Sequence, residues 1–296
     1  MPEFEIEPTA AGRLARWMQR ARIVRKHVHV ARLRHASVDL GFTVIERDAD
    51  LGGGLLAGAL AYRLFVLLLP TAVLLVSGLG LYAGATDKSP GQVAEEAGLN
   101  GLIAHEVASA ASSRGRVLVF VLMIPAVLYA TATLYRSLAK VHALVWKGSA
   151  RGVRTTWNGV GVLLGAFALQ FAAAETVGWI RRTDQLGGVA ALAVYLVLVG
   201  GAWLVVSNEL PHPNATWLAL VPGSALFGTG LMFVNVFNVY VTTRLVEGRA
   251  DTYGALGIAA ALLFSLVLVG RLIIVSAELN ALLDERRQRR IQSAGK

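Results

Sequence analysis

Six long stretches of the sequence contain almost no charged residues, and each is long enough to cross a lipid bilayer as a helix. A transmembrane helix needs about 20 apolar residues to span a hydrocarbon core about 30 Å thick. Only helices and closed barrels satisfy every backbone hydrogen bond in lipid, and barrel strands would be about ten residues long with alternating polarity. The stretches are about twice that length, so the sequence predicts an all-α integral membrane protein.

The predicted transmembrane helices cover residues 54–82, 117–138, 157–180, 187–206, 216–241 and 253–276. They lie in a chain of which only 16% is charged, against about 25% for a soluble domain, and its charges gather between the apolar stretches. We divide the chain into an N-terminal basic segment (1–50), a six-helix transmembrane domain (51–280) and a basic cytoplasmic tail (281–296).

Residues 11–35 repeat apolar side chains at three- and four-residue steps, with basic residues mostly on the other faces. This pattern is typical of a basic amphipathic helix that lies in the membrane interface. A solvated helix docked on the protein is the alternative. Residues 1–10 show no such pattern, and we expect them to be disordered.

Lysine and arginine are unevenly distributed between the two sides of the predicted bundle. With the N-terminus inside, 19 basic residues face the cytoplasm and 7 face outside. The positive-inside rule then places both termini in the cytoplasm. We interpret the net charge of +9 as reflecting this topology and contact with anionic lipid headgroups, and expect no nucleic-acid partner.

Two arginines fall inside predicted transmembrane helices, where a charge is costly and therefore suggests function. Arg63 lies about 14 Å from the cytoplasmic end of the first helix, and Arg271 about 10 Å from that of the sixth. Our hypothesis is that they share a polar cavity and hold an anionic group such as a lipid phosphate. Alternatively, each snorkels to the interface or pairs with a carboxylate. Glu278 is two helical turns from Arg271, too far for an ordinary i,i+4 pair.

Other polar residues in apolar stretches are candidates for a substrate cavity. Asn235 and Asn238 share a face of the fifth helix, and Gln170 and Glu175 lie in the third. Bonding between helices is the alternative for all four, and Glu175 could pair with Arg182.

Small and cyclic residues suggest structural roles. The Gly54/Gly58 and Gly161/Gly165 pairs fit close helix packing. Pro70, Pro125 and Pro222 should kink their helices.

Motifs for common enzyme classes are absent from the sequence. It contains no Gly-x-x-x-x-Gly-Lys-Ser/Thr loop, no His-Glu-x-x-His and no Gly-x-Ser-x-Gly. It has no cysteine, and its six histidines lack metal-ligand spacing and lie in predicted loops or the basic segment. We predict neither an enzyme nor a cofactor or metal site.

Several short blocks occur in an order that resembles the YihY/BrkB family of bacterial inner-membrane proteins. They are Leu60-Ala61-Tyr62 followed by Pro70, Leu210-Pro211, Pro222-Gly223-Ser224 followed by Tyr240, Tyr253-Gly254-Ala255-Leu256-Gly257, and Ala277-Glu278-Leu279-Asn280. The resemblance covers residues 50–285 and adds Tyr62 to the candidate cavity residues. Arg63 and Leu67 depart from the family's usual pattern.

This resemblance implies six transmembrane helices and a role in envelope integrity. Together with the residues above, it leads us to expect a transporter or lipid-translocating protein that handles an anionic lipid or solute. The alternative is a non-transporting scaffold that organises envelope machinery. The expected partners are membrane lipids and either a second copy of the chain or envelope proteins.

Overall fold

The structure is a computed structural model that describes residues 32, 34–86, 115–146, 150–183, 187–213, 215–237 and 250–294. Within these ranges the side chains of residues 116, 171, 174–191, 236–237 and 250–259 are not described. The chain divides into two compact units, residues 1–50 and residues 51–296. The predictions for residues 1–31 lie outside the described residues.

In the first unit, helix α2 (Ala36–Asp50) carries a small ion-pair cluster. The Arg32 guanidinium donates to Asp39, at 3.2 Å, and to both carboxylate oxygens of Glu46. The hydrogen bond from Arg32 lowers the pKa of Glu46 below its ordinary value. The guanidinium also lies 5.6 Å from the centre of the Phe42 ring. These contacts join Arg32, which precedes the helix, to Asp39 in its first turn and to Glu46 near its end.

The second unit consists, in its described part, of six long helices and no strand. They are α3 (Gly53–Ala85), α6 (Arg116–Val145), α7 (Trp157–Thr183), α8 (Gly187–Glu209), α9 (Trp217–Phe237) and α11 (Ala250–Ala294). Five are long and apolar enough to cross a membrane, and α7 contributes a shorter apolar stretch, Trp157–Gln170, within the described residues. The all-helical membrane architecture is therefore confirmed.

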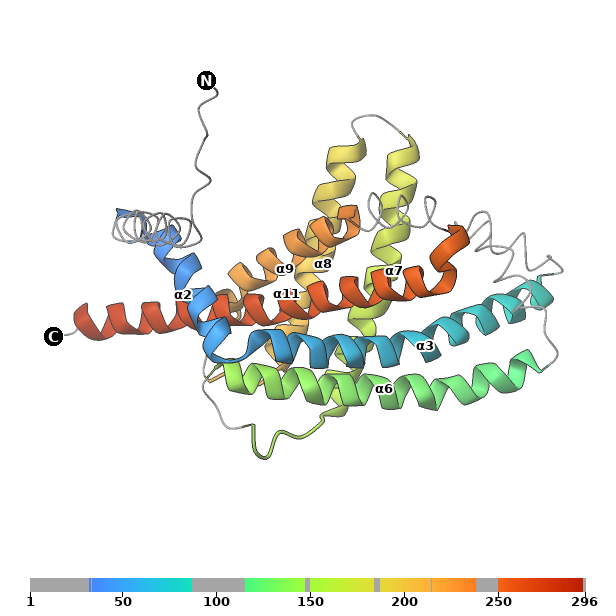
Figure 1. Cartoon of the computed structure of the whole chain (residues 1–296), viewed down its shortest axis with the longest axis horizontal. Coiled ribbons are helices and arrows are strands. Elements are labelled where there is room, and N and C mark those ends of the chain that lie inside the picture. The colour runs from blue at the N-terminus through green and yellow to red at the C-terminus, as the bar shows by residue number, and fades with distance from the viewer. Residues whose placement is uncertain are drawn as a thin grey trace, which may run out of the picture. The chain divides into compact units, whose positions relative to one another are not determined.

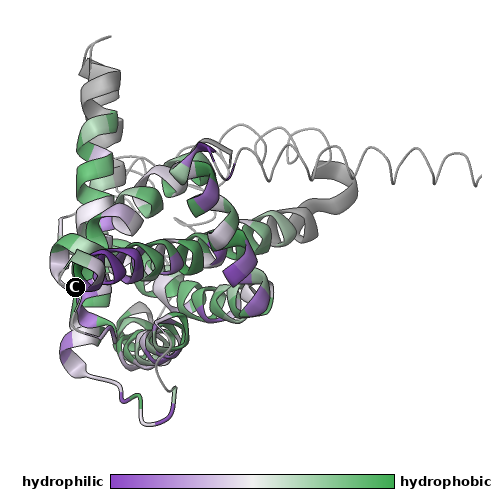
Figure 2. Ribbon diagram, turned by 90° about the vertical axis from the view of Figure 1, so that its left-hand side faces the viewer, coloured by the Kyte–Doolittle hydropathy of each residue, from purple (hydrophilic) through white to green (hydrophobic). Residues whose placement is uncertain are grey.

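Large apolar side chains cover the outside of these helices as well as the inside. Leu55, Leu118, Tyr129 and Val197 are each more than half exposed. In Figure 2 the helices are coloured mostly as hydrophobic. An apolar surface this extensive needs lipid around it.

The six helices form a closed ring of neighbours. Each packs against the next along the chain, and α11 returns to pack against α3 as well as α9. Figure 1 shows α3, α6 and α11 running side by side, while α7 and α8 form a pair. The ring encloses a core in which Leu60, Leu134 and Ile274 are fully buried.

Close helix contacts occur at glycines other than those in the predicted pairs. A Cβ at Gly270 would lie 2.6 Å from the Ala57 carbonyl oxygen, and one at Gly223 would lie 2.2 Å from that of Ser276. A Cβ at Gly54, Gly58, Gly161 or Gly165 would meet nothing within 4 Å. The prediction for those two pairs is wrong because their helices present them to open space.

The helices extend beyond several predicted ends. α6 continues through Lys140 to Val145, and α8 through Glu209, where loops were expected. α11 is one helix of 45 residues that includes residues 281–294 of the predicted tail. The predicted helix ends, placed where charged residues begin, were too early, because a helix can continue after it leaves the lipid. The three prolines lie inside α3, α6 and α9, which continue through them.

Candidate functional site

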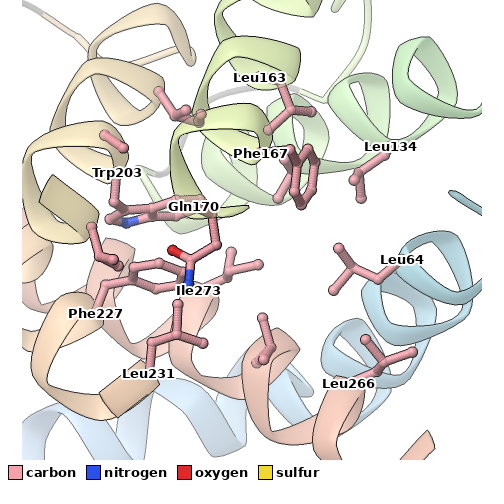
Figure 3. Close-up of a pocket in the computed structure, with 16 residues that line it drawn as sticks. Leu64, Leu134, Leu163, Phe167, Gln170, Trp203, Phe227, Leu231, Leu266 and Ile273 are labelled. Atoms are coloured by element: carbon pink, nitrogen blue, oxygen red, sulfur yellow. The ribbon is translucent and has the colours of Figure 1, made fainter. Parts of the chain in front are cut away.

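An apolar cavity of about 240 Å³ lies inside the ring, and all six helices contribute to its wall. Figure 3 shows its lining, which consists of Leu64, Leu134, Leu138, Leu163, Ala166, Phe167, Gln170, Val199, Ala202, Trp203, Val206, Phe227, Leu231, Leu266, Val269 and Ile273. An engineered apolar cavity of about 150 Å³ already binds benzene. This cavity therefore has room for a hydrocarbon group, and no side chain in its lining carries a charge.

Gln170 is the lining residue with the most polar side chain. Its Nε2 donates to the Tyr195 hydroxyl at 2.9 Å. Figure 3 shows the amide reaching into the space between Trp203 and Ile273. Of the predicted cavity residues, Gln170 is the one that this lining contains.

The depth of the cavity can be estimated along helices whose direction the topology prediction gives. Leu64 lies 11 residues into α3, and Gln170 lies 13 residues into α7. On α8, Val206 is three residues before the last residue. At 1.5 Å per residue, the cavity lies about 5–20 Å from the helix ends predicted to be cytoplasmic.

Two blocks of the sequence resemblance meet at a hydrogen-bonded junction between α9 and α11. The buried Asn280 side chain accepts from Gly223 N–H at 2.7 Å and donates to the Leu220 carbonyl at 3.1 Å. The Ser224 hydroxyl donates to the same carbonyl at 2.9 Å. Asn280 thus holds α9 at the turn that contains Pro222, and the missing Cβ of Gly223 makes the approach fit.

A second junction joins α8 to α11 beside the cavity. Trp203 Nε1 donates to the Ser276 hydroxyl at 3.2 Å, and that hydroxyl donates to the Ile273 carbonyl at 2.8 Å. The Trp203 ring stacks on Phe227 with the centres 4.2 Å apart. Both rings line the cavity, so these contacts fix part of its wall.

The two transmembrane arginines lie outside the lining of this cavity. Arg63 is half-buried beside Leu64, with its guanidinium 5.9 Å from the centre of the Tyr62 ring, and Tyr62 is 60% exposed. Arg271 is half-buried on α11. Cavity residues 266, 269 and 273 share one face of that helix, and at 3.6 residues per turn Arg271 lies on the opposite face. The hypothesis of a polar pocket shared by the two arginines stays a prediction.

The other predicted residues lie at scattered places. Glu278 is fully buried on α11, two residues before Asn280, and Asn235 is exposed on α9. Asn238 and the side chain of Glu175 lie outside the described residues.

A group of three rings, two of them buried, lies at the predicted cytoplasmic end. His142, expected in a loop or basic segment, is 1% exposed inside α6. Its Nδ1, Trp146 Nε1 and His212 Nδ1 form no hydrogen bond within the described residues, and the Trp146 and His212 rings are 6.2 Å apart. The described residues contain no group of three or more metal-ligating side chains. The loop prediction for His142 is wrong because α6 continues past the apolar stretch.

Sequence reasoning missed Asn280 and Tyr195 as positioning residues. Each is a polar group next to or inside an apolar stretch, and such groups find a partner when they are buried. That signal marks both residues, but the partner on another helix emerges only from the packing.

The comparisons with known proteins identify a family. The family model described as "Virulence factor BrkB" matches residues 45–296, which includes every helix of the ring. No curated protein matches the chain, and no solved structure matches it. Since the match covers most of the chain, this multi-pass membrane protein belongs to the BrkB virulence factor family.

Proposed function

We propose that the protein is a bacterial inner-membrane transporter that moves an anionic amphiphile between the leaflets and so supports envelope integrity. The observation that carries the proposal is the uncharged cavity at the centre of the ring. A hydrocarbon chain can enter it at no electrostatic cost, while a charged headgroup would lose its hydration there. The cavity therefore suits the chain of an amphiphile and not its headgroup.

Exposed basic residues at the predicted cytoplasmic end suit the headgroup. Arg136 and Lys140 lie on the last turns of α6, and Arg151 and Arg154 follow in the next connection. A cationic surface beside the membrane attracts anionic lipids by about 1 kcal/mol per basic residue. The proposed partners are therefore anionic membrane lipids.

Transfer of lipid between the two leaflets of vesicles tests the proposal. The protein is reconstituted into vesicles that contain fluorescent phosphatidylglycerol or fluorescent phosphatidylcholine, and a membrane-impermeant quencher reports the lipid that reaches the outer leaflet. We expect the protein to accelerate transfer of phosphatidylglycerol more than of phosphatidylcholine. Ala166→Phe fills the cavity and should abolish the acceleration.

Ala168→Phe is the matched control because Ala168 is exposed on the same helix two residues away. It should transport as the parent does. If the parent transfers neither lipid faster than protein-free vesicles do, or if both phenylalanine variants behave as the parent, the proposal is wrong.

A non-transporting scaffold is the second candidate. The observation that favours it is the end of α11, where residues 287–294 are exposed and contain Arg287, Arg289 and Arg290. A basic helix that emerges from the membrane can dock an acidic partner. In that case replacing these three arginines by glutamine would impair envelope integrity in cells, while Ala166→Phe would have no effect.

A further inference from the structure

Within the described residues, the Gln170 side chain makes one hydrogen bond and keeps further hydrogen-bonding capacity. One amide N–H is used by the Tyr195 hydroxyl. A primary amide has a second N–H and a carbonyl oxygen with two lone pairs, and Figure 3 shows this group beside Trp203, Phe227 and Ile273, which line the cavity. The neighbouring polar group, Trp203 Nε1, is already bonded to Ser276. Gln170 is thus the lining side chain that can bind a polar group of an occupant.

An amide that faces an apolar space is unfavourable unless something bonds to it. Leucine, valine or phenylalanine would complete the wall without that cost, and those residues occupy most of the lining. Tyr195, on the next helix, is 5% exposed, and its hydroxyl accepts a hydrogen bond from the amide and holds it in place. This is the arrangement of a site in which one polar group sets the position of an otherwise apolar ligand.

From this geometry we infer that the cavity binds one hydrocarbon chain that carries a neutral hydrogen-bonding group, a hydroxyl or an ester carbonyl, and that Gln170 bonds to that group while Tyr195 positions the amide. The inference rests on the proposed function and names the part of the amphiphile that the cavity recognises. Two features limit the ligand. The volume of about 240 Å³ holds a segment of one chain, and the uncharged lining excludes an ionised group.

Fluorescence quenching of Trp203 measures occupancy of the cavity, since its ring lines the wall. Three brominated probes are added to the full-length protein in detergent: bromoundecane, bromoundecanol and the methyl ester of bromoundecanoic acid. The first has no hydrogen-bonding group, and the others carry a hydroxyl and an ester carbonyl. Trp203→Phe gives the background from the other five tryptophans.

For each polar probe, the concentration that gives half-maximal quenching is divided by that of bromoundecane. We expect this ratio to be about tenfold lower in the parent than in Gln170→Met. One neutral hydrogen bond of ordinary strength gives about this factor. Because the same probes are compared in both proteins, their different partitioning into detergent cancels. The polar probe for which this ratio changes more shows whether Gln170 bonds to a hydroxyl or to an ester carbonyl.

Tyr195→Phe provides a second variant that removes one oxygen atom and keeps the ring. It should still be quenched by bromoundecane as the parent is, with a smaller preference for the polar probes, because the amide is no longer fixed. A role of Gln170 in folding alone would leave the preference unchanged in Tyr195→Phe, and this result would overturn the inference even if Gln170→Met failed to fold.

The same measurements separate the role of Gln170 from the ability of the cavity to take a chain. Equal probe preference in the parent and Gln170→Met, with quenching that Trp203→Phe removes, overturns the role of Gln170 and leaves an occupied cavity. If no probe quenches Trp203 in the parent, the cavity does not take a chain, and both proposals are wrong.

Discussion

Asn280 illustrates how a single side chain can hold two membrane helices together. It occupies both a donor and an acceptor of the α9 backbone. Replacing it by leucine would leave the Gly223 N–H without its 2.7 Å acceptor and force an apolar side chain against a position that already lacks a Cβ. A buried backbone group left without a partner costs about 1–3 kcal/mol.

We therefore predict that Asn280→Leu lowers the free energy of unfolding by about 1–3 kcal/mol, measured by titration with a denaturing detergent. Asn235→Leu is the control, because Asn235 is exposed on α9 and its replacement should cause no loss. Equal stability of Asn280→Leu and the parent would contradict the role of this junction.

The residues that sequence reasoning could find were those that are conspicuous by type. An arginine or glutamine in an apolar stretch stands out, and Gln170 does line the cavity. The partners of such residues could not be predicted in the same way. Tyr195 is 25 residues from Gln170, and Asn280 is 57 from Gly223, so each contact depends on how the helices pack.

At the scale of helices, the positions of close approach decide which glycines matter. Gly270 faces the backbone of α3, where a Cβ would lie 2.6 Å from an oxygen atom that cannot move aside easily. Gly165 faces open space on α7. The spacing of glycines alone does not distinguish these two environments, which is why the predicted pairs proved to be exposed.

Alanine substitutions at Gly270 and Gly165 should have different effects on the free energy of unfolding. Gly270→Ala should reduce the free energy of unfolding by about 1–3 kcal/mol because the helices must separate. Gly165→Ala should leave it unchanged or raise it by up to about 1 kcal/mol, since alanine favours the helix and meets no neighbour. Equal effects of the two substitutions in the same unfolding experiment would contradict the described α3–α11 contact.

The presence of each helix could be predicted from the length and hydrophobicity of its apolar stretch, but the positions of the helix ends could not. α11 extends to Ala294 because its charged residues continue as a helix outside lipid, and α6 carries Lys140 and His142 beyond the predicted end. Hydropathy reports where the membrane is, and a helix ends only where capping or loop residues stop it. That difference accounts for the boundary errors.

For the whole molecule, the orientation of the bundle remains a prediction from the distribution of basic residues. The chain lacks cysteine, so single cysteines can be introduced without background. In intact cells, Thr86→Cys should react with a membrane-impermeant thiol reagent, because Thr86 is exposed after the predicted outer end of α3. Ser293→Cys, exposed near the end of α11, should react only after the cells are opened. The reverse pattern would contradict cytoplasmic termini.

We propose that a ring of membrane-crossing helices surrounds a cavity that a lipid chain occupies. The most direct measurement is a structure of the protein in lipid nanodiscs, at a resolution that distinguishes an acyl chain from water. We expect elongated density for one chain between Trp203 and Phe227 on one side and Leu64 on the other, with Gln170 at its polar group. A cavity that is empty or closed by collapse of the helices, in a bilayer rich in anionic lipid, would contradict it.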